Sequence, residues 1–98
     1  MANDETATTN IRDLVLDGDW NEDTSRPIHS IQFHPGNAND ILQVRADAAD
    51  GPIIFEAEAA AVTSFLVKYF GGLDVQLYIN SADFTLNAGH RIIIVYED

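Results

Sequence analysis

The sequence predicts an all-β protein, built as a small antiparallel β-sandwich or jelly-roll-like domain. Apolar blocks rich in β-branched residues recur from Ile28 to Tyr96, and turn-forming residues separate them. Several blocks alternate with polar residues at the period of two that is typical of half-buried strands. A length of 98 residues suits one such domain. We therefore expect six to eight mostly antiparallel strands within residues 11–98, preceded by a flexible N-terminal arm at residues 1–10.

The N-terminal third is polar and contains a single apolar block. Residues 1–10 are small, polar and acidic, so their burial would not repay the entropy lost on ordering. Ile11–Leu16 is short and apolar and predicts the first strand. Asp17–Pro27 combines acids, amides, glycine, proline and the only tryptophan, and it predicts a long loop. Loops of this length in a compact domain usually have a function or are held by a partner.

Three alternating segments predict the next strands. Ile31 and Phe33 share one face of the first, and Leu42–Ala46 alternates in the second. The third is Ile53–Glu58, where Ile54 lies on the polar side and becomes a candidate interface residue. The best helix formers of the chain lie in Glu56–Thr63, so a short helix there is an equal alternative.

The C-terminal half contains a hairpin signal and an uninterrupted apolar run. Gly71-Gly72 separates two strand-like segments, and its tolerance of positive φ predicts a primed hairpin turn. Ile92–Tyr96 has no polar alternation and predicts a central strand with both faces covered. The residues expected in the core are Leu42, Val44, Phe55, Val75, Leu77, Ile93 and Val95.

Composition restricts the classes of partner. The chain has sixteen acidic and five basic residues, which gives a formal net charge of -11. The basic residues are scattered and form no positive stripe, so we expect no direct binding of nucleic acid. No apolar run approaches the roughly 18 residues of a membrane helix, so we expect no membrane partner. The absence of cysteine excludes disulfides and thiolate metal sites.

The acidic loop contains the best candidates for metal ligands. Asp17, Asp19, Asn21 and Asp23 place oxygen atoms at the alternating positions with which acidic loops surround calcium. Glu22, however, stands where an EF-hand needs glycine. A solvated acidic loop is therefore favoured, and we assign neither a metal nor a cofactor.

Two residues are candidates for binding a partner. Trp20 lies within the polar loop, where its ring either folds back onto the sandwich or is presented to another protein. Ile54 is the second candidate, because it is an apolar residue on an otherwise polar strand face.

We predict no catalytic residues. The histidines lack a metal-binding spacing, and the serines lack the nucleophile elbow of a hydrolase. The residues weighed and set aside on these grounds are His29, His34, His90, Ser30, Ser64 and Ser81.

Five segments carry a resemblance to a class of known proteins. They are Ile28–Gly36, Asp40–Arg45, Gly51–Phe55, Lys68–Leu73 and Thr85–Ile94. In this order, their strand and turn texture resembles the small β-rich structural proteins of tailed bacteriophages. The resemblance covers about seven tenths of the chain, from Ile28 to Tyr96, and leaves Met1–Pro27 outside.

The resemblance implies a non-enzymatic virion protein, made in the cytoplasm of the host bacterium. We expect a capsid decoration (cement) protein that binds the outer surface of a phage head and stabilises it. A head-tail or tail accessory protein is one alternative. A ligand- or carbohydrate-binding β-sandwich is another, and it would need Trp20, Tyr69 and Tyr78 to gather on one exposed face.

The implied partners are the major capsid protein or other virion proteins, together with further copies of this chain. We expect a homo-oligomer, because the polar arm, the loop with Trp20 and Ile54 on a polar strand face offer more apolar contact surface than a monomer needs. The resemblance favours a trimer, since phage shell proteins of this kind occupy symmetry axes, and closed rings of other order are the alternatives. The contacts are expected from residues 1–10 and from the loop Asp17–Pro27, with Trp20 as the anchor.

Overall fold

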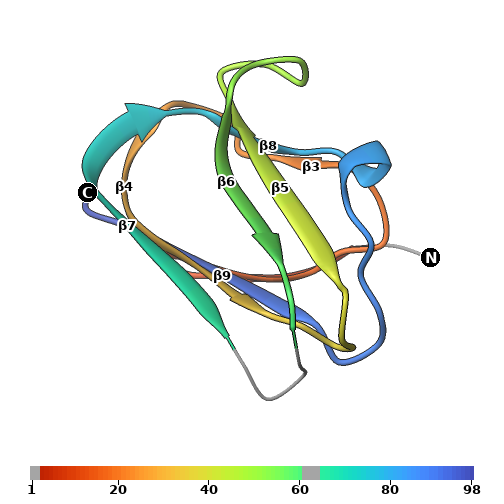
Figure 1. The fold of residues 1–98 in the computed structure, drawn as a ribbon. Helices are drawn as coiled ribbons and strands as arrows, with labels where there is room; N and C mark the ends of the chain where they lie inside the picture. Colours follow the sequence, from red (N-terminus) through yellow and green to blue (C-terminus); the bar gives the residue numbers. More distant parts are fainter. Residues whose placement is uncertain (1–2, 61–64) are drawn as a thin grey trace.

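The chain folds into two antiparallel sheets packed face to face, which confirms the predicted all-β sandwich (Figure 1). The computed structural model describes residues 3–60 and 65–98. One sheet has the order β1-β2-β9-β4-β7. Its strands are β1 (Asp4–Ala7), β2 (Ile11–Val15), β9 (Arg91–Tyr96), β4 (Arg26–His34) and β7 (Leu66–Val75).

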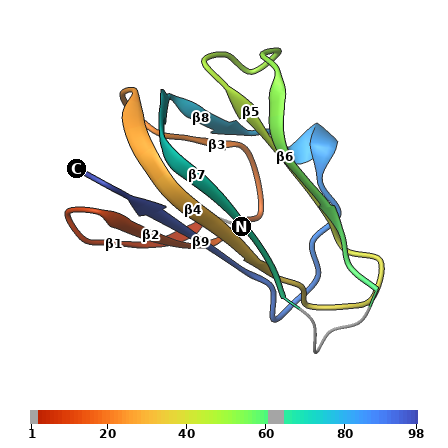
Figure 2. The same ribbon diagram turned by 60° about the vertical axis from the view of Figure 1, so that its left-hand side comes forward.

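The second sheet has the order β3-β8-β5-β6. Its strands are β3 (Trp20–Asn21), β8 (Leu77–Ile79), β5 (Ile41–Ala46) and β6 (Ile53–Glu58), and a short 3-10 helix, η1 (Ser81–Asp83), follows β8. Figure 2 shows the two layers from another side. None of the described residues forms a helix with the length and apolar character that crossing a membrane requires.

The core lies between the two sheets and follows the alternation of their strands. Five of the seven predicted core residues are buried: Leu42, Val44, Phe55, Val75 and Leu77. The prediction was wrong for Ile93 and Val95, which are half-buried on the other side of β9. A run without polar residues does not show which alternate side chains face the core. In β9 the side chains that face the core are Ile92, Ile94 and Tyr96.

Two N-terminal segments contain strands that the sequence did not predict. Asp4–Ala7, expected within a flexible arm, forms the edge strand β1, paired with β2 along its whole length. Within the predicted loop, Trp20 and Asn21 form β3 and pair with β8. Residues 11–98 contain eight described strands, β2 to β9, which agrees with the predicted six to eight, and β1 is a ninth strand in the segment expected to be a flexible arm.

The Gly71-Gly72 pair does not form the predicted hairpin turn. Strand β7 continues through both glycines, whose φ angles are 64° and 90°. Three residues of β7, from Phe70 to Gly72, lie opposite His29 alone in the register with β4. Glycines with positive φ occur in strand bulges as well as in turns, and here they form a bulge of three residues opposite one in β7.

The chain passes between the sheets at Gln76, between β7 and β8. The backbone amide of Asp47 donates to the Gln76 carbonyl at 2.7 Å, and the Gln76 amide donates to the Asp47 carboxylate at 3.1 Å. Asp47 has a φ of 71°, which an aspartate tolerates better than most residues. These two bonds fix the point at which β7 leaves the first sheet.

The predicted strand Ile53–Glu58 is confirmed as β6, and the helix considered as an equal alternative for Glu56–Thr63 does not form over its first part. Pairing with β5 satisfies the backbone of Glu56–Glu58 and outweighs their helix propensity. Residues 61–64 lie outside the described part of the chain.

One end of the sandwich is closed around the buried carboxylate of Asp40. It accepts hydrogen bonds from the backbone amides of Gly36, Asn37 and Asn87, at 2.9–3.2 Å, and from the Asn87 side chain at 2.5 Å. Burial is the largest influence on the Asp40 pKa and raises it, but the four hydrogen bonds together lower the pKa below its usual 3.8. Gly36 must lack a side chain here, since a Cβ would lie 2.4 Å from the Asn87 carbonyl oxygen.

The lowered pKa of Asp40 gives a pH-dependent contribution to stability. In the unfolded chain the carboxyl titrates near its usual value of about 4, so the stabilisation is present above that pH. It is lost as the pH falls through the lower pKa of the folded state. We expect Asp40→Asn to reduce the free energy of unfolding by about 1–3 kcal/mol at pH 7, and the deficit to shrink below about pH 4. Urea unfolding of the parent and of Asp40→Asn from neutral to acid pH measures this difference in the free energy of unfolding. A difference that stays the same at all pH values would contradict the prediction.

Candidate functional site

The outer surface of the five-stranded sheet carries an apolar patch arranged in rows across the strands. In one row Ile11 pairs with Val95, and Ser30 lies between Val95 and Tyr69. In the next row Ile93 pairs with Asp13 and Gln32, and Val67 follows on β7. We define the apolar face as Ile11, Val15, Phe65, Val67, Tyr69, Ile93 and Val95.

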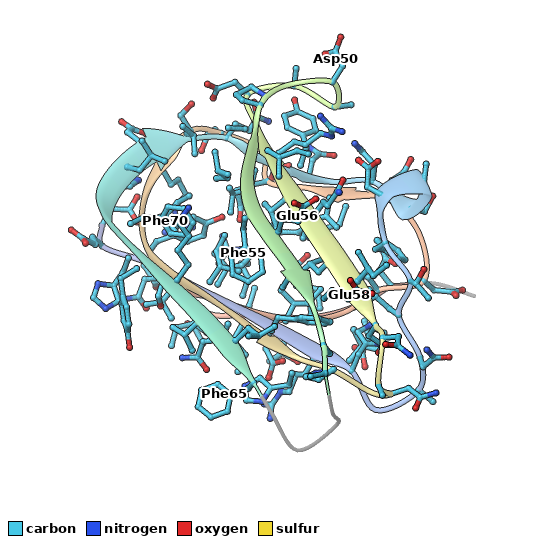
Figure 3. All side chains as sticks on the ribbon, viewed as in Figure 1. Asp50, Phe55, Glu56, Glu58, Phe65 and Phe70 are labelled. Carbon is cyan, nitrogen blue, oxygen red and sulfur yellow. The ribbon has the colours of Figure 1, made fainter. Side chains whose placement is uncertain are left out.

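The apolar face concentrates exposed hydrophobic side chains. Tyr69 is 70% exposed, Phe65 57%, Val15 42% and Ile11 39%. These are four of the six large hydrophobic residues exposed in the described chain. Phe65 projects from the start of β7 away from the body (Figure 3). Scattered exposed hydrophobics are ordinary, but a contiguous patch on one sheet marks an interaction surface.

The charged and imidazole groups on this face contact one another or the neighbouring aromatic rings. The Arg91 guanidinium binds Asp13, with Nε donating to Oδ1 at 2.9 Å, and this hydrogen bond lowers the pKa of Asp13. The His34 ring stacks on Phe65 at 5.0 Å between centroids, and the His29 ring meets Tyr69 edge-on at 5.6 Å. The centre of the face is therefore close to neutral in a strongly acidic molecule.

The outer surface of the four-stranded sheet is polar. Gln43 binds Glu56 at 2.5 Å, and Arg45 donates to Asp83 at 3.0 Å. Glu56 and Glu58 are both exposed on β6. The two outer surfaces thus differ in chemistry: four exposed large hydrophobic residues belong to the apolar face, whereas Ile53 is the one in the described strands of the four-stranded sheet.

Trp20 and Ile54, the two residues expected to bind a partner, are not exposed at the surface. Trp20 is only 9% exposed, and its indole Nε1 donates to Glu5 at 2.7 Å, so the ring has folded back into the core and is not a surface anchor. Ile54 is half-buried and packs against the core. A bulge opposite Val44 and Arg45 inserts Ile54 as an extra residue of β6, which leaves Ile53 as the exposed isoleucine instead.

The calcium candidates are not brought together. The Asp19 carboxylate accepts the Ser81 amide at 2.7 Å, and this bond lowers its pKa. The Asn21 side chain donates to the neighbouring Glu22 carbonyl, while Asp17 and Asp23 are exposed. Across residues 3–60 and 65–98, no three histidine, cysteine or acidic side chains are grouped so that they could hold a metal ion.

A buried charged cluster, which the sequence did not predict, is centred on Glu22. Its carboxylate binds the Arg12 guanidinium through two hydrogen bonds, at 3.0 and 3.2 Å, and accepts the Tyr96 hydroxyl at 2.7 Å. Burial first, and Glu22 second, raises the pKa of the Tyr96 hydroxyl. Arg26 lies over the Tyr96 ring at 4.1 Å. Glu22 appears in a loop motif with no periodicity, so nothing in the sequence marks it as buried.

The histidines and serines have structural positions. The His90 Nε2 atom accepts the Leu16 backbone amide at 2.9 Å, so Nδ1 carries the proton and donates to the Asn87 carbonyl at 2.7 Å. Ser30 is buried in β4, and the Ser81 amide is held by Asp19. Ser64 lies outside the described residues.

A polar hollow of about 390 Å³ lies beside η1, lined by Arg45, Asn80 and three aspartates. Arg45 is bound to Asp83 and to the Gly51 carbonyl, and the Asn80 side chain donates to the Ala49 carbonyl. These groups therefore hold the surrounding loops together.

Comparison with known protein families, curated proteins and solved structures finds no match to this chain.

The Glu22 cluster predicts a strong energetic coupling. We expect Glu22→Ala to cost about 3–5 kcal/mol, because Arg12 loses its hydrogen-bonded carboxylate partner in a mostly buried position. Tyr96→Phe removes one hydrogen bond to a charged group and should cost about 1.5–3 kcal/mol. The double variant Glu22→Ala with Arg12→Ala should cost less than the sum of the single changes. Denaturant unfolding of the parent, the three single variants and the double variant measures these costs, and a double variant that costs the sum of its two single changes would contradict the predicted coupling.

Proposed function

We propose that this protein is a non-enzymatic structural component of a phage virion, of the capsid decoration type, and that its apolar face is the surface by which it assembles. The observation that supports this proposal is the contrast between the two outer surfaces of the sandwich. The apolar face suits protein contact, whereas the polar surface of the four-stranded sheet suits water. A shell component needs both kinds of surface.

The internal polar groups support a structural role over a catalytic one. Glu22, Asp40 and His90 are the groups with the most unusual surroundings, and each is engaged by hydrogen bonds within the fold. General acid or base catalysis needs a titratable group within reach of a bound substrate. The hydrogen bonds of these three groups instead connect segments of the chain within the fold.

The positions of the apolar face and of the aromatic residues bear differently on the two alternative functions. A head-tail or tail accessory protein would use the same apolar face and stays the second candidate. A carbohydrate-binding module needed Trp20, Tyr69 and Tyr78 on one exposed surface. Trp20 is buried, Tyr69 lies on the five-stranded sheet, and Tyr78 lies in β8 of the other sheet, so this candidate loses its aromatic platform.

The genes on either side of this one provide the first test, since we expect genes for capsid, portal or tail proteins there. The second uses empty capsids assembled from the major capsid protein encoded nearby. We expect the purified chain to sediment with these capsids to saturation and to raise their temperature of disruption, and the heat-denatured chain serves as the control. Neighbouring genes without virion proteins, or capsids that neither bind the chain nor gain stability, would contradict the proposal. Binding to tails alone would support the accessory alternative.

A further inference from the structure

We propose that the apolar face binds the same face of a second copy of this chain, forming a two-fold dimer in which two five-stranded sheets pack against each other. This inference names the occupant of the surface used in the proposed function. It depends on that surface being an assembly face, and not on the protein belonging to a phage.

The first support is the two-sided character of β9. Ile92, Ile94 and Tyr96 are at most 1% exposed beneath the four-stranded sheet. Ile93 and Val95 on the opposite side are only half-buried, and no second layer formed by the described residues covers them. Strands with continuous apolar runs are typically covered on both faces. A second sheet on the outer side would complete that coverage.

The second support is the distribution of charge. The formal net charge of -11 means that two copies repel each other over most of their surfaces. On the apolar face, Asp13 and Arg91 form an ion pair and neutralise each other. A basic partner would be drawn to the acidic surfaces and not to this one. A second copy meets the least repulsion at the apolar face.

The third support is that the free strand edges are unfavourable for association through added strands. The four edge strands are β1, β7, β3 and β6. Strand β1 is short, exposed and acidic, and β3 has only two residues. Strands β6 and β7 each contain a bulge, and the Lys68 ammonium donates to the Ile54 carbonyl at 2.9 Å, which covers part of the β6 edge. Bulges, charges and lysines are the devices by which proteins prevent edge pairing. Contact through a sheet face is the remaining mode.

The face also has the shape for self-packing. Packed sheets lie about 10 Å apart with their strands within about 30° of each other. A two-fold axis parallel to the strands would set β7 of one copy against β2 of the other. The prominent rings of Phe65 and Tyr69 would then meet the shorter side chains of Ile11 and Val15. Such an isologous contact closes on itself and gives a dimer instead of the trimer expected from the resemblance.

Sedimentation equilibrium of the full chain tests the proposal, with two matched variants. Val15→Glu lies on the apolar face, and Ile53→Glu lies on the polar surface of the other sheet. The two side chains are almost equally exposed, at 42% and 41%. We expect a dimer whose dissociation constant rises more than about tenfold in Val15→Glu and stays within about twofold in Ile53→Glu. Circular dichroism checks that both variants keep the β fold.

Salt dependence provides an independent readout. Raising sodium chloride from about 50 mM to about 500 mM should tighten the dimer, because salt screens repulsion between two acidic copies. A monomer at all concentrations, a trimer, equal effects of the two variants, or a dimer weakened by salt would each overturn the inference. If the chain is monomeric but binds capsids, the dimer is contradicted and the proposed function is still supported. If the chain dimerises but does not bind capsids, the proposed function is contradicted and the dimer is still supported.

Discussion

The strand β9 imposes the main constraint on this structure, because its apolar run has two faces to bury. Its position between β2 and β4 places Ile92 and Ile94 at the centre of the core. The same alternation places Ile93 and Val95 at the centre of the opposite surface. The described residues provide one covering layer, the four-stranded sheet, and that layer covers one side of β9. The apolar face is thus a direct consequence of the strand that builds the core.

Two buried carboxylates hold the ends of the sandwich in place around this strand. At one end, Glu22 joins β2 through Arg12 and the end of β9 through Tyr96. At the other, Asp40 joins the turn after β4 to the turn before β9 through Asn87. Each carboxylate is satisfied by several donors, which makes a buried charge tolerable. The sheet that presents the apolar face is therefore fixed at both ends by polar bonds.

The predictable part of the fold was the part with clear alternation. Strands β4, β5 and β6 follow from their period of two, and a central position for β9 follows from its continuous apolar character. The failures have local physical causes. A run without polar residues could not reveal which side of β9 faces the core, and positive φ at Gly71-Gly72 served a bulge as well as a turn. The edge strand β1 forms by pairing with β2, which outweighs its polar composition.

The candidate site was less predictable because it depends on register. Tyr69, Val95 and Ile11 are far apart in sequence and meet only through the pairing of four strands. Trp20 was visible in the sequence, yet its ring is buried and its indole N–H donates to Glu5, which lies in a segment expected to be flexible. Ile54 was judged by alternation, and the bulge in β6 exchanged its position with that of Ile53. Which residues are exposed on a strand therefore depends on its register and its bulges, and the alternation of polar and apolar residues in the sequence does not reveal these.

The most direct measurement of the central claim is a nuclear magnetic resonance experiment on a mixture of two isotopically distinct preparations of this chain. It detects contacts between methyl groups of one copy and protons of the other. The account predicts intermolecular contacts from the methyl groups of Ile11, Ile93 and Val95, and none from those of Ile53. Contacts confined to Ile53 and the polar sheet, or none at concentrations where the chain has associated, would contradict it.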